Sequence, residues 1–95
     1  MRIRVVRSGG FAGLRVERAV DTTLLPIAER VRVERLVIEA DFFELPARAV
    51  SGLPDVIQYQ VWVEADRRHH EVATDERTAG GAMLALVERV LGVEP

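Results

Sequence analysis

The sequence predicts one α+β domain over residues 1–95, in which a four-stranded antiparallel sheet carries two helices packed on one face. Three observations support this fold class. Four segments alternate apolar and polar residues with the period of two that is typical of strands. Two other segments carry apolar residues at helical spacing. The elements follow one another in the order ββαββα, and the connection within each strand pair is short enough for a hairpin.

The first two expected strands are residues 2–7 and 14–20. In the first strand Ile3 and Val5 share one face, and arginines occupy the other. Between the strands, residues 8–13 contain three glycines, which supply positive φ angles and allow close approach of the backbone. We therefore expect a hairpin with a wide, glycine-bearing tip.

A first helix is expected from Pro26 to about Phe43, because cap residues precede Pro26 and proline suits a first helical turn. Its apolar residues form two rows, whereas a surface helix usually has one. One row comprises Leu24, Ile27, Ala28, Val31, Ile38 and Phe42, and the opposite row comprises Val33, Leu36, Val37 and Ala40. Two rows are compatible with a bent helix, with a helix covered on both sides, or with an apolar surface left for a partner.

The second half of the chain repeats this order of elements. Pro46 ends the first helix, and residues 47–54 form an irregular connection. Residues 56–65 show the clearest alternation in the chain, and a tight turn then leads to a fourth strand over residues 68–74. Residues 82–91 form a short amphipathic helix that a glycine terminates. Either hairpin could supply the central strands of the sheet.

Composition argues against several classes of function. The formal net charge of -2 argues against a nucleic-acid binder. The chain has no cysteine, which excludes disulfide scaffolds, thiolate zinc sites and thiol nucleophiles. The first ten residues contain three arginines and no apolar run, so no signal peptide is expected, and no segment is suited to span a bilayer. We expect a cytoplasmic protein that binds neither nucleic acid nor membrane.

Few residues of the sequence are suited to catalysis. His69 and His70 are adjacent on an expected strand, so their side chains point to opposite faces and cannot jointly bind one metal ion. Ser8 and Ser51 are the only serines, and neither lies in a nucleophile elbow. The acidic residues 75–76 are interpreted as a cap and solvated charge. We therefore expect neither enzymatic activity nor a metal or cofactor.

Two large side chains are candidate anchors for a protein partner. Trp62 is expected on the sheet face opposite the core, and an exposed tryptophan is a common interface anchor. Alternatively, Trp62 covers arginine stems across the sheet. Phe11 is the large apolar residue of the glycine-rich tip, and it either projects from the tip or folds under the hairpin into the core.

Four short motifs follow one another along the chain. They are residues 8–13 (SGGFAG), residues 40–46 (ADFFELP), residues 53–55 (LPD) followed by Tyr59, and residues 70–72 (HEV) before an acidic turn. In this order they resemble the emfourin family, small protein inhibitors of thermolysin-like metallopeptidases of the protealysin type. The resemblance covers nearly the whole chain. It implies a non-enzymatic α+β domain that binds the active-site cleft of a zinc peptidase.

The resemblance leaves two placements of the inhibitory contact open. In the first, residues 8–11 enter the cleft like a substrate, and Phe11 fills the apolar specificity pocket that such enzymes use. In the second, the connection over residues 47–55 enters the cleft with Leu53 as its anchor. In the first placement the rigid hairpin lowers the ordering cost of binding. The candidate partner-binding residues are Ser8, Gly9, Gly10, Phe11, Leu53, Pro54, Asp55 and Trp62.

Two other classes of function are also compatible with the sequence. The chain could be a generic protein-interaction or structural domain without a protease target, for example a homodimer that uses the second apolar row of the first helix. A small-molecule binder or enzyme would need a ligand-sized cavity in the sheet. We expect an inhibitor that acts as a monomer rather than as a homodimer.

Overall fold

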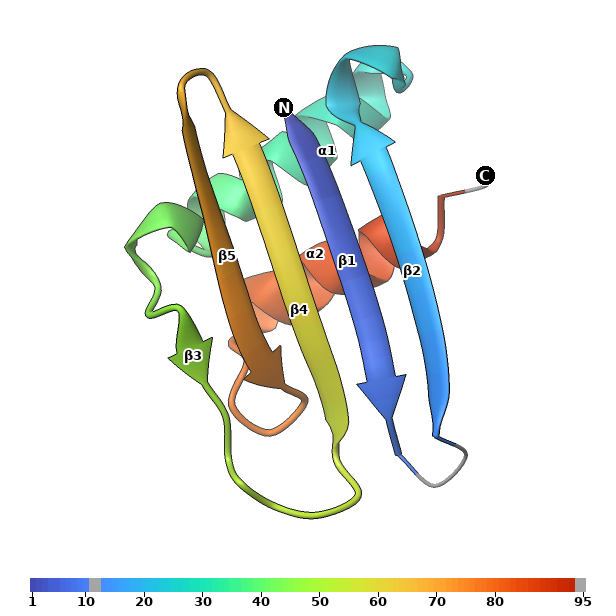
Figure 1. Ribbon diagram of the computed structural model, residues 1–95. Helices are drawn as coiled ribbons and strands as arrows, with labels where there is room; N and C mark the ends of the chain where they lie inside the picture. The colour runs from blue at the N-terminus through green and yellow to red at the C-terminus, as the bar shows by residue number, and fades with distance from the viewer. Residues whose placement is uncertain (11–12, 94–95) are drawn as a thin grey trace.

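Five strands form one sheet in the order β2-β1-β4-β5-β3, and both helices lie on one face of it (Figure 1). The structure is a computed structural model that describes residues 1–10 and 13–93. The strands are β1 (Arg2–Gly9), β2 (Leu14–Asp21), β3 (Arg48–Ala49), β4 (Ile57–Ala65) and β5 (Arg68–Asp75). The predicted α+β class is confirmed.

The two hairpins predicted from the sequence meet through their first strands. β1 pairs antiparallel with β2 on one side and with β4 on the other, and β4 pairs antiparallel with β5. β1 and β4 are therefore central strands, which the sequence had left open. In the β1–β4 pair Arg2 lies opposite Glu64 and Gly9 lies opposite Ile57.

The sheet has a fifth strand that the sequence analysis missed, so the predicted four strands and ββαββα order are wrong in this detail. β3 pairs parallel with β5, with Arg48 opposite Ala73. The Ala73 N–H donates to the carbonyl of Ala47 at 2.8 Å. A two-residue strand has no alternation to detect, because a period of two needs four or more residues to show.

The first helix is shorter than the sequence predicted. It runs as α1 over Ile27–Glu39, and Asp41 then adopts a left-handed backbone with φ 51°. The helix therefore ends at Glu39, seven residues before Pro46, and the turn at Asp41 leads the chain into a short 3₁₀ helix, η2 (Phe42–Glu44). The second helix, α2 (Gly81–Leu91), agrees with its predicted position, and η1 (Thr22–Leu24) precedes α1. None of the helices within the described residues is long and apolar enough to cross a membrane.

The core lies between the inner sheet face and the two helices. Its members are apolar side chains of the four long strands, of both helices and of η2: Ile3, Val5, Val20, Tyr59, Val61, Val63, Val72, Val33, Val37, Phe42, Met83, Leu86, Val87 and Val90. Phe42 belongs to this core because the turn at Asp41 brings it back under the sheet, where it is 1% exposed. The inner face of α1 is thus the row that contains Val33 and Val37.

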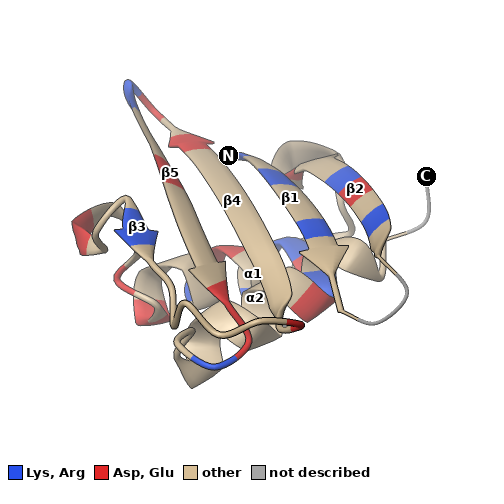
Figure 2. Cartoon of the chain, turned by 60° about the horizontal axis from the view of Figure 1, so that its bottom comes forward, with Lys and Arg blue, Asp and Glu red and all other residues tan. Residues whose placement is uncertain are grey.

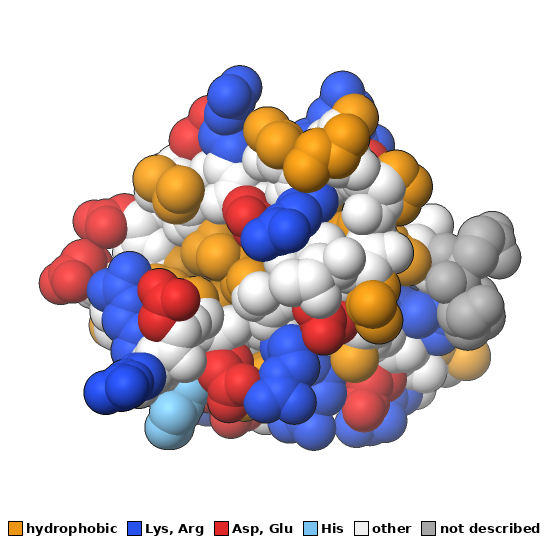
Figure 3. Space-filling model, turned by 90° about the horizontal axis from the view of Figure 1, so that it is seen from above, with side chains coloured by type: hydrophobic (Ala, Val, Ile, Leu, Met, Phe, Trp, Pro, Cys, Tyr) orange, Lys and Arg blue, Asp and Glu red, His pale blue; other side chains and the backbone are white. Residues whose placement is uncertain are grey.

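The other apolar row of α1 is exposed. Ile27, Val31 and Ile38 are 73%, 48% and 75% exposed, and Leu24 of η1 is 83% exposed. The sequence was compatible with a bent helix, with a helix covered on both sides, or with an exposed apolar surface. The structure agrees with the third of these, because the outer row of α1 faces solvent. Figure 3 shows the molecule from the top of Figure 1. Apolar side chains at this end are interspersed with charged ones.

Candidate protein-binding site

The two loops that the sequence analysis treated as rivals lie side by side at one end of the sheet. β1 ends where β4 begins, since Gly9 lies opposite Ile57. Gly10 and Gly13, the described residues of the β1–β2 tip, and the connection from β3 to β4, residues 50–56, therefore lie at the same end of the sheet, together with the β5–α2 turn (Figure 1). We call this the loop end.

Glycine at position 9 allows the end of β1 to approach the 50–56 connection closely. Gly9 has a φ of 92°, and a Cβ atom at this position would lie 2.9 Å from the carbonyl oxygen of Val56. Such a contact is too short for a side chain, so the backbones approach closely only because residue 9 has none. Gly10, with a φ of 75°, lies over Ile57, and its carbonyl accepts from the Gly13 N–H at 3.3 Å. Ser8 is half-buried at the base of this tip.

Phe11 lies outside the described residues. Its insertion into a partner's apolar pocket, and the alternative of packing into the core, both remain predictions from the sequence.

The 50–56 connection presents an exposed leucine on a shaped backbone. Leu53 is 50% exposed, and Pro54 and Asp55 beside it are also exposed. Gly52 and Asp55 both have left-handed backbones, with φ 75° and 60°. Proline fixes its own φ, so the segment has few conformations available. An apolar side chain is thus displayed on a turn of defined geometry.

A buried carboxylate holds this connection to the rest of the molecule. Asp75, at the end of β5, is 0% exposed. Its Oδ2 accepts from the Ser51 N–H at 2.6 Å and from the Ser51 Oγ at 2.8 Å. Its Oδ1 accepts from the backbone N–H groups of Arg77 and Thr78 at 3.0 and 2.9 Å. One carboxylate therefore joins the 50–56 connection to the β5–α2 turn.

These hydrogen bonds keep Asp75 ionised. The backbone hydrogen bond from Ser51 is the largest influence that holds the pKa of Asp75 far below its ordinary value, and it outweighs the opposing effect of burial. Burying an unpaired carboxylate costs free energy, whereas the four hydrogen bonds that Asp75 accepts stabilise its charge.

The cap predicted at residues 75–76 is present, but the prediction that its charge is solvated is wrong for Asp75, which is buried. The partner Ser51 is 24 residues away, so no local pattern indicates the contact.

Neighbouring contacts fix both ends of the same connection. The Thr74 hydroxyl donates to the carbonyl of Ala49 at 2.8 Å, and the Glu76 N–H donates to the carbonyl of Ile57 at 3.0 Å. Within the connection, the Leu53 N–H donates to the Ser51 Oγ at 3.2 Å. The route from Asp75 to Leu53 thus passes through one serine hydroxyl.

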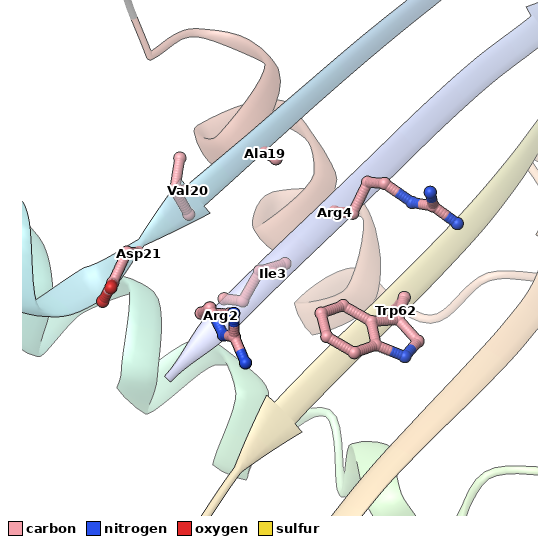
Figure 4. A pocket seen from close by; sticks show the side chains of 7 residues that line it. All are labelled: Arg2, Ile3, Arg4, Ala19, Val20, Asp21 and Trp62. Carbon is pink, nitrogen blue, oxygen red and sulfur yellow. The ribbon is translucent and has the colours of Figure 1, made fainter.

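Trp62 lies on the outer sheet face, away from the loop end. It is half-buried, opposite Arg4 of β1 and Glu71 of β5. It lines an open hollow of about 410 Å³ with Arg2, Arg4 and Ala19, and Figure 4 shows the Arg4 and Trp62 side chains on the same face of neighbouring strands. Trp62 lies five positions beyond Ile57 along β4, so the structure does not bring it together with the two loops.

Charges on the outer face are mixed in sign. Figure 2 shows basic residues along β1 and β2 and acidic residues at the ends of β4 and β5. Arg2 forms an ion pair with Glu64 across the β1–β4 pair, and Arg15 pairs with Glu17 at 2.9 Å. Two of the basic side chains here, Arg2 and Arg15, thus have acidic partners.

The two histidines lie on opposite faces of β5, as the alternation predicts. His70 lies opposite Val63, with its Nε2 2.7 Å from the carbonyl oxygen of Leu45 and its ring edge-on to Phe42. His69 lies opposite Glu64. Residues 1–10 and 13–93 contain no group of three or more metal-ligating side chains.

The arrangement defines a small α+β domain that displays two adjoining loops, one of them tied down by a buried carboxylate, at one end of its sheet. Such a surface is suited to binding another protein. The chain belongs to the Emfourin family, whose family model matches residues 5–91 of the 95. This confirms the resemblance found in the sequence, and the family indicates a metallopeptidase inhibitor rather than an enzyme. The searches of curated proteins and of solved structures found no significant match.

Proposed function

We propose that the protein inhibits thermolysin-like zinc metallopeptidases of the protealysin type by placing its loop end in the active-site cleft. The observation that carries this proposal is the adjacency of the β1–β2 tip and the 50–56 connection, with exposed Leu53 on a backbone that Asp75 holds. Membership of the Emfourin family supports the inhibitory role.

The two loops act together in this proposal. Leu53 enters an apolar pocket of the peptidase, where burial of a leucine side chain contributes about 2 kcal/mol. Gly9 and Gly10 bring the tip against the base of the same connection, so both loops approach one groove. Because the connection is ordered before binding, little conformational entropy is lost when the complex forms. The chain binds as a monomer, in the cytoplasm, without a cofactor.

Titration of a thermolysin-like peptidase with the purified protein tests the proposal. We expect stoichiometric loss of peptidase activity. Leu53→Ala should raise the inhibition constant by about 10- to 100-fold, as expected for a central apolar anchor. Leu24→Ala is the matched control, because Leu24 is 83% exposed and lies beyond the opposite end of β2. No inhibition by the wild-type protein would reject the proposed function.

Phe11→Ala distinguishes the contribution of the tip from that of the connection. If both Phe11→Ala and Leu53→Ala weaken inhibition while the variants stay folded, the two loops share the contact. An unchanged constant for Phe11→Ala rejects the substrate-like entry of the tip, and an unchanged constant for Leu53→Ala rejects the anchor in the connection.

The exposed row on α1 favours a second candidate function, a protein-interaction or structural role without a peptidase target. Leu24, Ile27, Val31 and Ile38 present apolar surface to solvent, and such surface on a small protein often marks an interface. Sedimentation over a range of protein concentrations separates the two candidates. A dimer that Ile38→Glu dissociates would favour the second, and a monomer that inhibits the peptidase would favour the first.

A further inference from the structure

We propose that Asp75 is a positioning residue for inhibition: through Ser51 it holds the 50–56 connection in its binding conformation, and Gly9 fixes the far end of the same connection. This inference rests on the proposed function. Neither Asp75 nor Ser51 needs to touch the peptidase, because both act on the backbone that carries Leu53.

The geometry of the carboxylate supports this role. Each oxygen of Asp75 serves a different segment: Oδ2 accepts two hydrogen bonds from Ser51, and Oδ1 accepts two from the β5–α2 turn. β5 and α2 are packed in the core, so the turn is a fixed reference for the loop. Ser51 is itself exposed, so its hydrogen bonds to Asp75, rather than packing, hold it in place.

The serine hydroxyl passes the constraint on to Leu53. Ser51 Oγ donates to Asp75 and also accepts from the Leu53 N–H at 3.2 Å. A hydroxyl is needed for this relay, since it combines one donor with acceptor lone pairs. Alanine at position 51 removes the relay but keeps the backbone hydrogen bond, whereas threonine keeps both.

The far end of the connection is fixed by packing. The carbonyl oxygen of Val56 lies only 2.9 Å from the position that a Cβ atom of residue 9 would take. Gly9 is a residue of β1, a central strand, so Val56 is held against a rigid element. With residues 51 and 56 both fixed, the segment between them is preorganised for binding.

Amide hydrogen exchange and inhibition constants, measured on the same variants, test the inference. The variants are Asp75→Asn, Ser51→Ala and Ser51→Thr, with Asp66→Asn in the β4–β5 turn as the control. Asp66 is exposed and has φ 56°, a conformation that asparagine adopts readily. We expect exchange at the Ser51 and Leu53 amides to accelerate about tenfold or more in Asp75→Asn, with exchange in β4 unchanged.

We expect the inhibition constants of the variants to rise in the same order as the exchange rates of their loop amides. We expect the inhibition constant to rise about 10- to 100-fold for Asp75→Asn, less for Ser51→Ala, and little for Ser51→Thr or Asp66→Asn. Equal acceleration across β4 would show that Asp75 only stabilises the fold and would overturn the inference, as would an unchanged constant in a folded Asp75→Asn. If Asp75→Asn does not fold, Ser51→Ala decides, because Ser51 lies on an exposed loop. If the wild-type protein does not inhibit, the proposed function fails and the exchange data still decide whether Asp75 orders the loop.

Discussion

At the scale of single residues, three carboxylates make the fold sensitive to acid. Hydrogen bonds lower the pKa of Asp75, chiefly from the Ser51 backbone, the pKa of Asp21, chiefly from the Thr23 hydroxyl, and the pKa of Glu34, chiefly from the Thr22 hydroxyl. Each group has a lower pKa in the folded than in the unfolded chain, where aspartate titrates at about 3.9 and glutamate at about 4.3. The stabilising effect of each group is therefore present above its unfolded pKa and is lost as the pH falls toward its folded pKa.

We predict that the free energy of unfolding declines steadily from pH 5 to pH 2.5, and that Asp75→Asn is less stable at pH 7 but declines less on acidification. Urea titrations followed by circular dichroism at several pH values measure both effects. An identical decline in the variant would contradict a role for the Asp75 charge.

Gly9 and Gly13 provide a matched comparison of two glycines in one hairpin. Gly9 has a φ of 92° and a carbonyl oxygen 2.9 Å from the position that its Cβ would take, whereas Gly13 has a φ of 61° and no atom of the described residues within 4 Å of that position. Alanine at position 13 should cost about 1 kcal/mol for the left-handed backbone. We predict that Gly9→Ala costs at least about 1 kcal/mol more, because the loop must also move. Denaturant unfolding measures the difference, and equal losses would show that the contact with Val56 is not tight.

At the scale of elements, alternation was sufficient to predict the four long strands and helical spacing was sufficient for α2. The end of α1 was missed because it depends on a left-handed aspartate, Asp41, which has no period and no glycine to mark it. The same error placed Phe42 in the outer row of the helix, although it lies in the core. Periodicity thus located the elements, whereas single backbone conformations decided where they stop.

The two rows of α1 differ in what they contribute to stability. Val31 is 48% exposed in the outer row and Val33 is 0% exposed in the inner row, so the same substitution can be compared at both positions. We predict that Val33→Ala lowers the free energy of unfolding by about 2 kcal/mol. Val31→Ala should change it by about 0.5 kcal/mol or less. Similar losses, with midpoints that depend on protein concentration, would show that the outer row is buried between two copies.

At the scale of the whole molecule, the candidate site is a product of strand order. The sequence indicated both loops, but their adjacency depends on the pairing of β1 with β4, which joins residues 48 positions apart at Gly9 and Ile57. The tie between Ser51 and Asp75 likewise depends on the parallel pairing of β3 with β5. Local patterns carry no information on either contact, so the site could be predicted only as two separate loops.

This arrangement separates the molecule into two ends that can be tested independently. The molecule is 38 Å along its longest axis, and the β4–β5 turn lies at the end of the sheet opposite the loop end (Figure 1). Because the chain has no cysteine, a single cysteine can be introduced at either end and labelled with a bulky maleimide. The labelled Leu53→Cys variant should lose inhibition by about 100-fold or more, since the label occupies the central contact.

The labelled Arg67→Cys variant, modified at an exposed residue of the β4–β5 turn, should inhibit as the wild type does. Unlabelled samples of both variants control for the substitutions, and maleimide-treated wild-type protein controls for the reagent. If the labelled Leu53→Cys variant still inhibits strongly, the contact lies outside the loop end. The same conclusion follows if the labelled Arg67→Cys variant loses inhibition. Full inhibition with only position 67 labelled would mean that the peptidase needs access to one end of the sheet alone.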